Sequence, residues 1–417
     1  MRTTIATTAT GTFRNGERLT VQTSIPNGSS RRSLFVGSVI LMAVSLAPAQ
    51  TMTVEPIANP AGKGSLQPNW SASASGVLLV SWTEKLADGT YALRFATRHG
   101  STWSEPQTVA THRHFFRHPA ELPEVITLSD KTMLAHWVET PEAGSDAEFV
   151  YVSASRDGLH WSIPAMANKD HSQVEHGLAS MVESGNGEAS LTWLQALKGE
   201  DGPVSLMRSV IGEDGKASKE EALDADVCAC CPTSIVRTSR GLLVAYRDHT
   251  PADIRDISTI RFEGGRWLPS KTLNADNWKL NACPVNAAAA AAKGDHVAIS
   301  WFTGAGSTPH VQVVFSTDGG TTFTKPVLVS TGHALGYTSI ALDDQNGAYV
   351  SWLEQGANST RVLVRHITAA ESTGPVLEVD HGARQAIGYP RLIHTGGETW
   401  IAWGSPTASK IQTARLK

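Results

Sequence analysis

Residues 78–84 read Leu-Leu-Val-Ser-Trp-Thr-Glu, a short aliphatic run closed by an aromatic residue and then a polar one. Similar phrases recur along the chain, and their aromatic residues are Trp82, Trp137, Trp193, Tyr246, Trp301, Trp352 and Trp403. Successive aromatic residues are 55, 56, 53, 55, 51 and 51 residues apart. A period near fifty, built from strand-like runs and Gly-rich turns, is typical of a β-propeller.

Each repeat divides into four strand-like segments, of which the aliphatic phrase is the second. The seventh repeat stops after its third segment, at Lys417. Residues 53–58 have the same Glu-Pro-apolar pattern as the outer segment 104–109, so they can supply the missing strand. We therefore predict an all-β, seven-bladed propeller closed by an N-terminal strand. A six-bladed ring with one divergent repeat is the alternative.

The first 49 residues are expected to be an export signal with a long polar leader. Arg31 and Arg32 precede an apolar run from Leu34 to Ala47, and cleavage is expected near Ala49. The run is too short to span a bilayer. The paired arginines fit the twin-arginine pathway and also ordinary export signals. Residues 50–417 would then form one propeller domain in the periplasm or outside the cell.

Composition excludes some classes of partner. The formal net charge is −4, and no basic block follows the signal, so nucleic acid is not expected as a partner. No later segment is long and apolar enough to span a membrane. Glu84, Glu139 and Glu354 each follow a repeated Trp by two residues, and they are expected to line the propeller mouth or to solvate it. Nothing in the sequence sets the oligomeric state.

A shared turn motif links the third and fourth segments of three repeats. Residues 316–323 read Ser-Thr-Asp-Gly-Gly-Thr-Thr-Phe, residues 155–161 read Ser-Arg-Asp-Gly-Leu-His-Trp, and residues 97–103 form a degraded copy. Asp and Ser oxygens in such a turn bond its own amides, and Gly takes the positive φ. The motif resembles the Asp box of the sialidase (neuraminidase) superfamily. This resemblance covers nearly the whole mature chain and implies the fold, but it implies no activity.

The loops before the inner strands are expected to meet at one face of the ring, and two of them hold every cysteine of the chain: Cys228, Cys230, Cys231 and Cys283. Oxidation of an exported protein predicts disulfides, such as Cys228–Cys231 and Cys230–Cys283, or another pairing. Alternatively, the thiolates bind copper or zinc together with His118 and His176, which occupy the same register as Cys231 and Cys283. Unpaired thiols are the third option.

The resemblance to sialidases also implies an arginine cluster for a substrate carboxylate, a Tyr–Glu nucleophile and an Asp acid/base. The first inner strand here reads Gln67-Pro68-Asn69 and lacks the expected arginine of an Arg-Ile-Pro motif. By position, Arg247, Arg255 and Arg391 are the candidate ligand-binding arginines. Tyr337 or Tyr389 would be the nucleophile, Glu175 its base and Asp226 the acid.

Three functions follow from these patterns. The first is an exported binding or accessory propeller whose axial mouth holds a metal ion or a small anionic ligand. The second is a sialidase-type exo-glycoside hydrolase acting on exposed glycans. The third is an interaction scaffold stapled by disulfides. The two Arg-Asp pairs of residues 247–248 and 255–256 would bind an anion in the first case, or pin their long loop in the others.

Overall fold

The computed structural model describes residues 7–12, 18–23, 52–198, 202–306, 308–383, 387–405 and 407–417. The chain divides into two compact units, residues 1–50 and residues 51–417. In the first unit, β1 (Thr7–Thr12) pairs antiparallel with β2 (Arg18–Thr23). The apolar run of the expected export signal and the cleavage position lie outside the described residues. Within the described residues, no helix has the length and apolar character that crossing a membrane requires.

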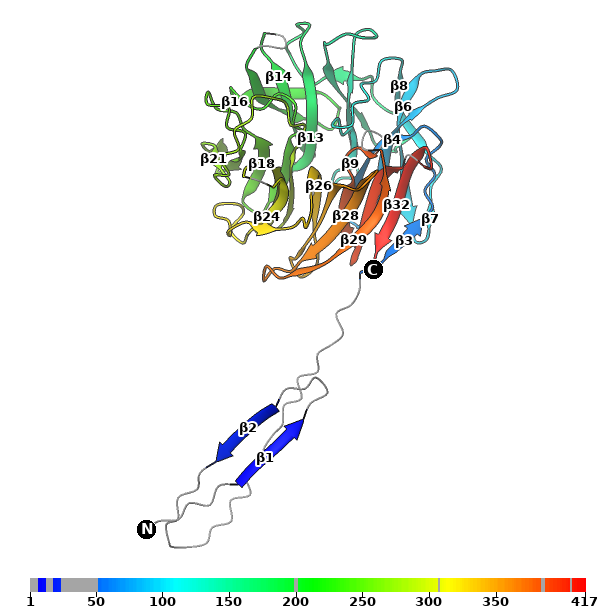
Figure 1. The fold of residues 1–417 in the computed structure, drawn as a ribbon. Coiled ribbons are helices and arrows are strands. Elements are labelled where there is room, and N and C mark those ends of the chain that lie inside the picture. Colours follow the sequence, from blue (N-terminus) through cyan, green and yellow to red (C-terminus); the bar gives the residue numbers. More distant parts are fainter. Residues whose placement is uncertain are drawn as a thin grey trace, which may run out of the picture. The chain divides into compact units, whose positions relative to one another are not determined.

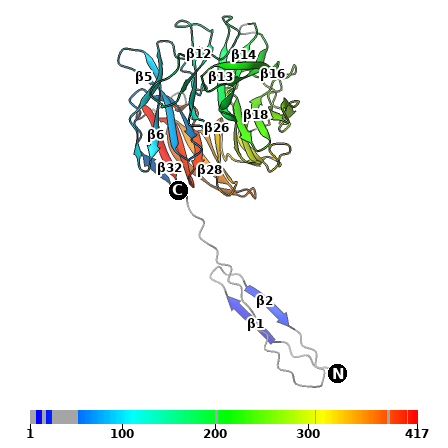
Figure 2. The same cartoon turned by 180° about the vertical axis from the view of Figure 1, so that it is seen from behind.

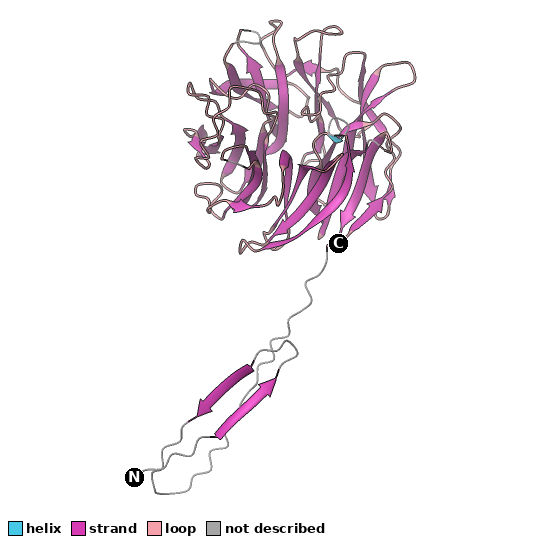
Figure 3. Cartoon of the chain, viewed as in Figure 1, coloured by secondary structure: helices cyan, strands magenta, loops and turns pink. Residues whose placement is uncertain are grey.

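The second unit is a ring of seven antiparallel sheets, as predicted, and each sheet is one blade (Figures 1 and 2). Strands joined by loops make up the ring (Figure 3). The first three blades are β4 (Leu66–Ala72), β5 (Leu78–Lys85), β6 (Tyr91–His99), β7 (Thr102–Trp103) and β8 (Gln107–His112); β9 (Glu124–Thr127), β10 (Met133–Glu139), β11 (Phe149–Ser155) and β12 (Ala165–Met166); and β13 (His176–Gly185), β14 (Glu188–Ala196), β15 (Val204–Ile211) and β16 (Ala217–Asp224).

The next three blades follow the same chain order. They are β17 (Ser234–Thr238), β18 (Gly241–Arg247), β19 (Ile257–Glu263), β20 (Arg266–Trp267) and β21 (Lys271–Thr272); β22 (Ala288–Lys293), β23 (His296–Thr303), β24 (His310–Ser316) and β25 (Val327–Leu328); and β26 (Ala334–Leu342), β27 (Ala348–Gln355), β28 (Thr360–Ile367) and β29 (Thr373–Gly382). In each blade the first strand is the innermost one.

The seventh blade joins the two ends of the propeller domain. Its strands are β30 (Arg391–Thr395), β31 (Glu398–Ser405), β32 (Lys410–Leu416) and β3 (Val54–Ile57), and β3 pairs with β32 from Val54↔Leu416 to Ile57↔Thr413. Figure 1 shows β3 beside β32 at the end of the chain. The predicted closure by an N-terminal strand is therefore confirmed. It covers the strand edge that β32 would otherwise expose.

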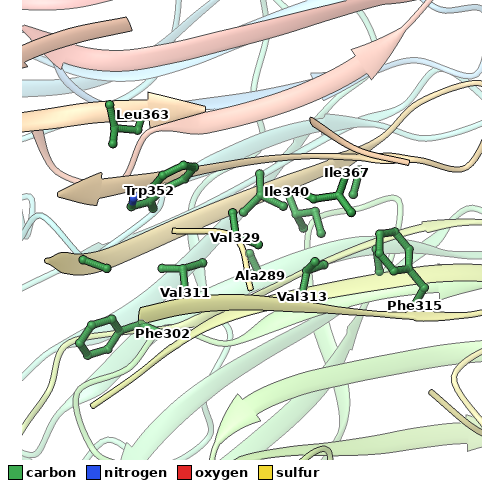
Figure 4. Packing of buried hydrophobic residues seen from close by; sticks show 14 of the residues in the cluster. Ala289, Phe302, Val311, Val313, Phe315, Val329, Ile340, Trp352, Leu363 and Ile367 are labelled. Carbon is green, nitrogen blue, oxygen red and sulfur yellow. The ribbon is translucent and has the colours of Figure 1, made fainter. Parts of the chain in front are cut away.

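The repeated aromatic residues form the core between blades. Trp82, Trp137, Trp193, Trp301 and Trp352 are completely buried in the second strands of their blades. Figure 4 shows the packing between the fifth and sixth blades, where Trp352 packs in one cluster with Val311 and Val313 of β24 and Leu363 of β28. Burying one such side chain contributes about 2–3 kcal/mol. The fifty-residue period thus reflects one large aromatic residue for each blade.

The acidic residues that follow three of these tryptophans do not line a mouth, so that expectation was wrong. The indole N–H donates to Glu84 in the first blade at 2.7 Å, to Glu139 in the second at 2.7 Å, and to Glu354 in the sixth at 3.2 Å. Residues i and i+2 share one face of a strand, and a buried indole N–H needs an acceptor. The Trp-x-Glu spacing is therefore structural.

The two Asp boxes take the expected conformation. Asp318 Oδ1 accepts the backbone N–H groups of Thr321 and Thr322 at 3.0 and 2.9 Å, and Ser316 Oγ accepts that of Gly320 at 2.9 Å. Asp157 does the same in the second blade, with Leu159 and His160. These turns join third strands to outer strands, away from the axis.

We predict that Glu354→Ala lowers the free energy of unfolding by about 3 kcal/mol. Glu354 accepts the Trp352 indole N–H and the Gly332 backbone N–H, and it pairs with Arg361, so truncation leaves the two N–H groups without their acceptor and leaves Arg361 only the more distant Glu378. Urea unfolding followed by tryptophan fluorescence measures the change. Glu105→Ala, at an exposed position of the outer segment of the first blade, is the control and should change stability by less than about 0.5 kcal/mol. Equal effects of the two variants would contradict the structural role of Glu354.

Candidate functional site

A repeated hydrogen bond joins neighbouring blades at the face where the inner strands begin. A side chain just before or at the start of one inner strand accepts a backbone N–H from the next blade. Glu121 Oε2 accepts from Leu178 at 2.7 Å, Cys231 Sγ accepts from Asn286 at 3.2 Å, and Asn286 Oδ1 accepts from Tyr337 at 2.8 Å. We call these three acceptors, Glu121, Cys231 and Asn286, the collar. One of the four cysteines is therefore part of the contact between blades.

Residues next to these bonds have an unusual backbone conformation. The φ angles are 52° at Gln67, 56° at Leu178, 51° at Val285 and 56° at Tyr337, all in the left-handed region. That region is rare for a β-branched residue such as Val285 and costs about 1–3 kcal/mol. Such strain persists only where surrounding bonds fix it, and it concentrates at functional sites.

Tyr389 closes the axis at this face. It is 2 % exposed, and its hydroxyl donates to Val285 O at 2.9 Å and accepts from Ala287 N at 3.0 Å, so the seventh blade reaches the fifth. Its ring centre lies 4.7 Å from that of Tyr337, which is also buried. Burial raises the pKa of Tyr389 well above its usual value. These contacts do not support Tyr389 as the nucleophile that the sialidase resemblance implied.

The axial cavity lies on the inner side of Tyr389 and has a volume of about 630 Å³. All seven inner strands line it. Tyr389, Leu122 and Ala287 are buried at one end, whereas Lys293 and Asp344 are exposed at the other. We expected the converging loops to surround an open mouth. In the described part of the chain, that face is closed by Tyr389, and the cavity reaches solvent at the opposite face.

The four cysteines meet beside this closed end. The Sγ atoms of Cys228, Cys230 and Cys231 all lie within 4.8 Å of one another, with Cys228 at 3.5 Å from Cys231 and 4.0 Å from Cys230. Cys283, from the loop before the fifth blade, lies near Cys230, which lowers its pKa, but it is not one of the three residues within 4.8 Å of one another. All four are thiols in this structure. Cys228 and Cys231 are buried, Cys230 is half-buried and Cys283 is exposed. We call the four residues the thiol cluster.

Two arginines add positive charge beside the thiol cluster. Hydrogen bonds with Cys230 and Cys231, together with the charge of Arg247, hold the pKa of Cys228 well below its usual value. A hydrogen bond with Cys230, with a smaller contribution from Arg255, lowers the pKa of Cys283 to about 7. Burial instead raises the pKa of Cys231. The cluster can therefore hold negative charge near neutral pH, while some of its thiols remain protonated.

The two arginines are themselves fixed by backbone carbonyls. Arg247 donates to Asn286 O and Phe302 O at 2.8 Å each and to Arg255 O, and it lies 4.9 Å from the ring centre of Trp278. Arg255 donates to Leu280 O at 3.2 Å. The two arginines fix the loop between β18 and β19 through hydrogen bonds to backbone carbonyls. The Arg-Asp ion pairs that the sequence suggested do not perform this role. The positive charge of the arginines nevertheless acts on the cysteines, that of Arg247 on Cys228 and that of Arg255 on Cys283.

The two histidines that shared a register with the cysteines lie elsewhere. The His118 ring stacks on Phe116, and its Nδ1 accepts the backbone N–H of Ala120. His176 is fully buried, stacks on Phe149, and contacts Glu148 O at 2.8 Å through Nδ1. Among the described residues, the only group of potential metal ligands that lies close enough together consists of Cys228, Cys230 and Cys231. The shared register did not bring the histidines into this group.

A buried carboxyl cluster adjoins the thiol cluster, and no motif in the sequence indicates it. A Cβ atom on Gly177 would lie 2.7 Å from Glu148 Oε2 and 3.2 Å from Glu121 Oε2, so both carboxyl groups face that glycine. Burial raises the pKa of Glu121 to about 7. Burial and the charges of Glu121 and Glu175 raise the pKa of Glu148 to about 9. The adjoining cavity, lined also by Glu175 and Ala229, measures only about 20 Å³.

The remaining candidates are not gathered into one site. Asp226 pairs with His249 at 2.8 Å. Glu175 lines the small cavity and influences both Glu148 and Cys283. Arg391 lies inside the axial cavity, on the other side of Tyr389. Glu121 and Glu148 were not singled out from the sequence, because each lies close to another acidic residue, Glu124 or Asp146, and belongs to no motif. The position of Glu148 directly before the apolar strand β11 was the available signal.

Comparison with known proteins supports the fold. No curated protein matches this sequence. A protein of unknown function from Dyadobacter fermentans is 14 % identical over 89 % of this chain and 100 % of its own, with a TM-score of 0.50. A lectin from Burkholderia pseudomallei is 10 % identical over 84 % of this chain and 96 % of its own, with a TM-score of 0.55. An ulvan lyase is 8 % identical over 86 % and 93 %, with a TM-score of 0.51.

Identities this low indicate a common fold and leave the activity undefined. A family model described as the BNR repeat-like domain matches residues 58–400, which is nearly the whole propeller. This match confirms the sialidase-superfamily propeller that the Asp boxes indicated. The chain belongs to the BNR repeat-like domain family.

Proposed function

We propose that this protein is an exported binding propeller whose thiol cluster holds one soft metal ion, copper(I) or zinc. One observation carries the proposal: the sulfur atoms of Cys228, Cys230 and Cys231 lie within 4.8 Å of one another, and Cys283, 52 residues after Cys231, is near enough for Cys230 to lower its pKa. Thiolates are the ligands that copper(I) and zinc prefer in proteins. The ion would join the fourth blade to the fifth.

The spacing of the sulfur atoms fits such an ion. A tetrahedral zinc site with bonds of about 2.3 Å separates its sulfur atoms by about 3.8 Å. The distances of 3.5 and 4.0 Å from Cys228 lie on either side of that value. A disulfide needs sulfur atoms at about 2.05 Å, so either expected bridge would require the side chains to move.

The surroundings also suit a thiolate–metal centre. Arg247 and Arg255 place two positive charges beside the cluster, which offsets the excess negative charge of several thiolates around a mono- or divalent ion. The backbone N–H of Asn286 donates to Cys231 Sγ at 3.2 Å, a bond that orients the ligand. Cys283 is the exposed member, so the ion can reach the cluster from that side.

Glycan hydrolysis is the second candidate, because Glu121 and Glu148 form a carboxyl pair with raised pKa values of about 7 and about 9. Such a pair could supply an acid and a base. However, the adjoining cavity of about 20 Å³ is too small for a sugar ring, and the sialidase arginine is absent from the first inner strand. A lectin and a polysaccharide lyase share the fold, which keeps glycans among the ligands to be tested.

We predict about one copper or zinc ion per chain in protein purified without a histidine tag and analysed by inductively coupled plasma mass spectrometry. Cys231→Ser and Cys283→Ser should each lose most of the ion, since each removes a thiolate ligand. His118→Ala is the matched control and should keep it, because His118 stacks on Phe116 outside the cluster. Metal-free protein with two disulfides would contradict the proposal and favour the stapled scaffold.

We also predict that Cys283 is the most reactive thiol of the reduced, metal-free protein. The hydrogen bond with Cys230 lowers the pKa of Cys283 to about 7, so its thiolate forms as the pH rises through 7. Iodoacetamide labelling, followed by peptide mass mapping, should reach half of its maximal rate at Cys283 near pH 7. Cys230→Ala removes the donor and should move that midpoint up, towards about 8.5. A midpoint of 8.5 in the parent protein would refute the assignment.

A further inference from the structure

The axial cavity contains one cation whose outer nitrogen atoms have no partner. Arg391 Nε donates to Asn69 Oδ1 at 3.0 Å, and the carbonyl of Arg391 accepts the Trp70 indole N–H at 3.1 Å. The first bond holds the guanidinium against the first blade, and the second holds the Arg391 backbone there. Among the described residues, neither Nη atom of Arg391 has a hydrogen-bond or ion-pair partner. Burial lowers the pKa of Arg391, which marks a cation that is incompletely compensated.

Glu124, at the start of β9, is the complementary group. It lines the same cavity and is the carboxylate whose charge acts on Arg391. Its nearest partner is His136 Nε2, at 3.8 Å, which is beyond hydrogen-bond length. Both ring nitrogens of His136, which lies opposite Glu124 on β10 outside the cavity wall, are buried without a hydrogen-bond partner. Among the described residues, the Glu124 carboxylate therefore has no partner at hydrogen-bond length.

The other charged groups of the cavity are already paired. Lys293 binds Asp344 at 3.0 Å, and His394 lies 3.4 Å from the same carboxylate, near the open end. Glu183 accepts from the Ser129 hydroxyl at 2.6 Å. Arg391 and Glu124 are therefore the charged side chains that remain for a ligand inside the cavity.

The cavity has the size and the wall of a small-molecule site. Its volume of about 630 Å³ lies within the usual range of about 300–1,000 Å³ for ligand pockets. An alanine run, Ala288–Ala292, forms most of the inner strand of the fifth blade and leaves this space open.

We propose that this cavity binds a small organic carboxylate that carries an ammonium or hydroxyl group on the neighbouring carbon. The carboxylate would accept two hydrogen bonds from the Nη atoms of Arg391, in the bidentate geometry that guanidinium favours. The ammonium or hydroxyl group would donate to Glu124. The ligand would enter from the face that carries Lys293 and Asp344, opposite the thiol cluster, so this site is independent of the proposed metal.

The test uses glycine, glycolate, acetate and ethylamine as probes, in ligand-observed NMR titrations of the full chain at constant ionic strength. Glycine and glycolate should bind roughly tenfold more tightly than acetate, since one charged hydrogen bond to Glu124 separates them, and ethylamine should not bind. Arg391→Gln should weaken every carboxylate at least about tenfold. Glu124→Gln should keep acetate binding but lose most of the preference for glycine.

Two controls make the outcome decisive. Arg365→Gln changes a half-buried arginine of β28 outside the cavity and should leave all affinities unchanged. If Arg391→Gln does not fold, Arg391→Lys keeps the charge without the forked geometry, and it should still weaken acetate severalfold. Absence of glycine and glycolate binding to the parent protein, or equal binding to the folded Arg391 variant, would overturn the proposal. The metal content of each of these arginine variants should equal that of the parent protein.

Discussion

The hydrogen bond from a backbone N–H of one blade to a side chain of the preceding blade is the contact on which the rest of this structure depends. Glu121, Cys231 and Asn286 accept these bonds at 2.7, 3.2 and 2.8 Å and hold left-handed residues at the start of the inner strands. A carboxylate, an amide and a thiol thus perform the same role in different blades. Cys231 therefore links the thiol cluster to a contact between the fourth and fifth blades.

This arrangement connects the thiol cluster to the end of the axial cavity. Asn286, which donates to Cys231, lies between Val285 and Ala287, and the Tyr389 hydroxyl bonds both of those residues. The proposed metal and the proposed carboxylate would thus lie on opposite sides of one tyrosine. Arg247 strengthens the connection, because it donates to Asn286 O and its charge also acts on Cys228.

The propeller could be predicted from the sequence because its signals are periodic and local. One large aromatic residue fills each blade, the Asp boxes form hydrogen bonds within a few residues, and the pattern of residues 53–58 identified the closing strand. The closed end of the axis could not be predicted in this way. Tyr389 meets Val285 and Ala287 more than 100 residues away, and no spacing within a repeat encodes that contact.

The candidate site was predicted in part for the same reason. The concentration of cysteines in two loops indicated a cluster, and the structure places Cys228, Cys230 and Cys231 within 4.8 Å of one another, with Cys283 near Cys230. Equal register suggested that His118 and His176 would join them, but the His118 ring stacks on Phe116 of its own loop, and the His176 ring stacks on Phe149 of the preceding blade. Glu84, Glu139 and Glu354 were misread because an acidic residue after a strand resembles a surface group. The buried indole N–H that each of them satisfies is visible only in three dimensions.

The central claim is that the four cysteines form one metal centre, and X-ray absorption spectroscopy at the metal edge tests it most directly. The measurement is made on the full chain as purified. We expect a first shell of sulfur alone, with three to four atoms at about 2.3 Å. A first shell dominated by nitrogen or oxygen would place the metal elsewhere and contradict the claim.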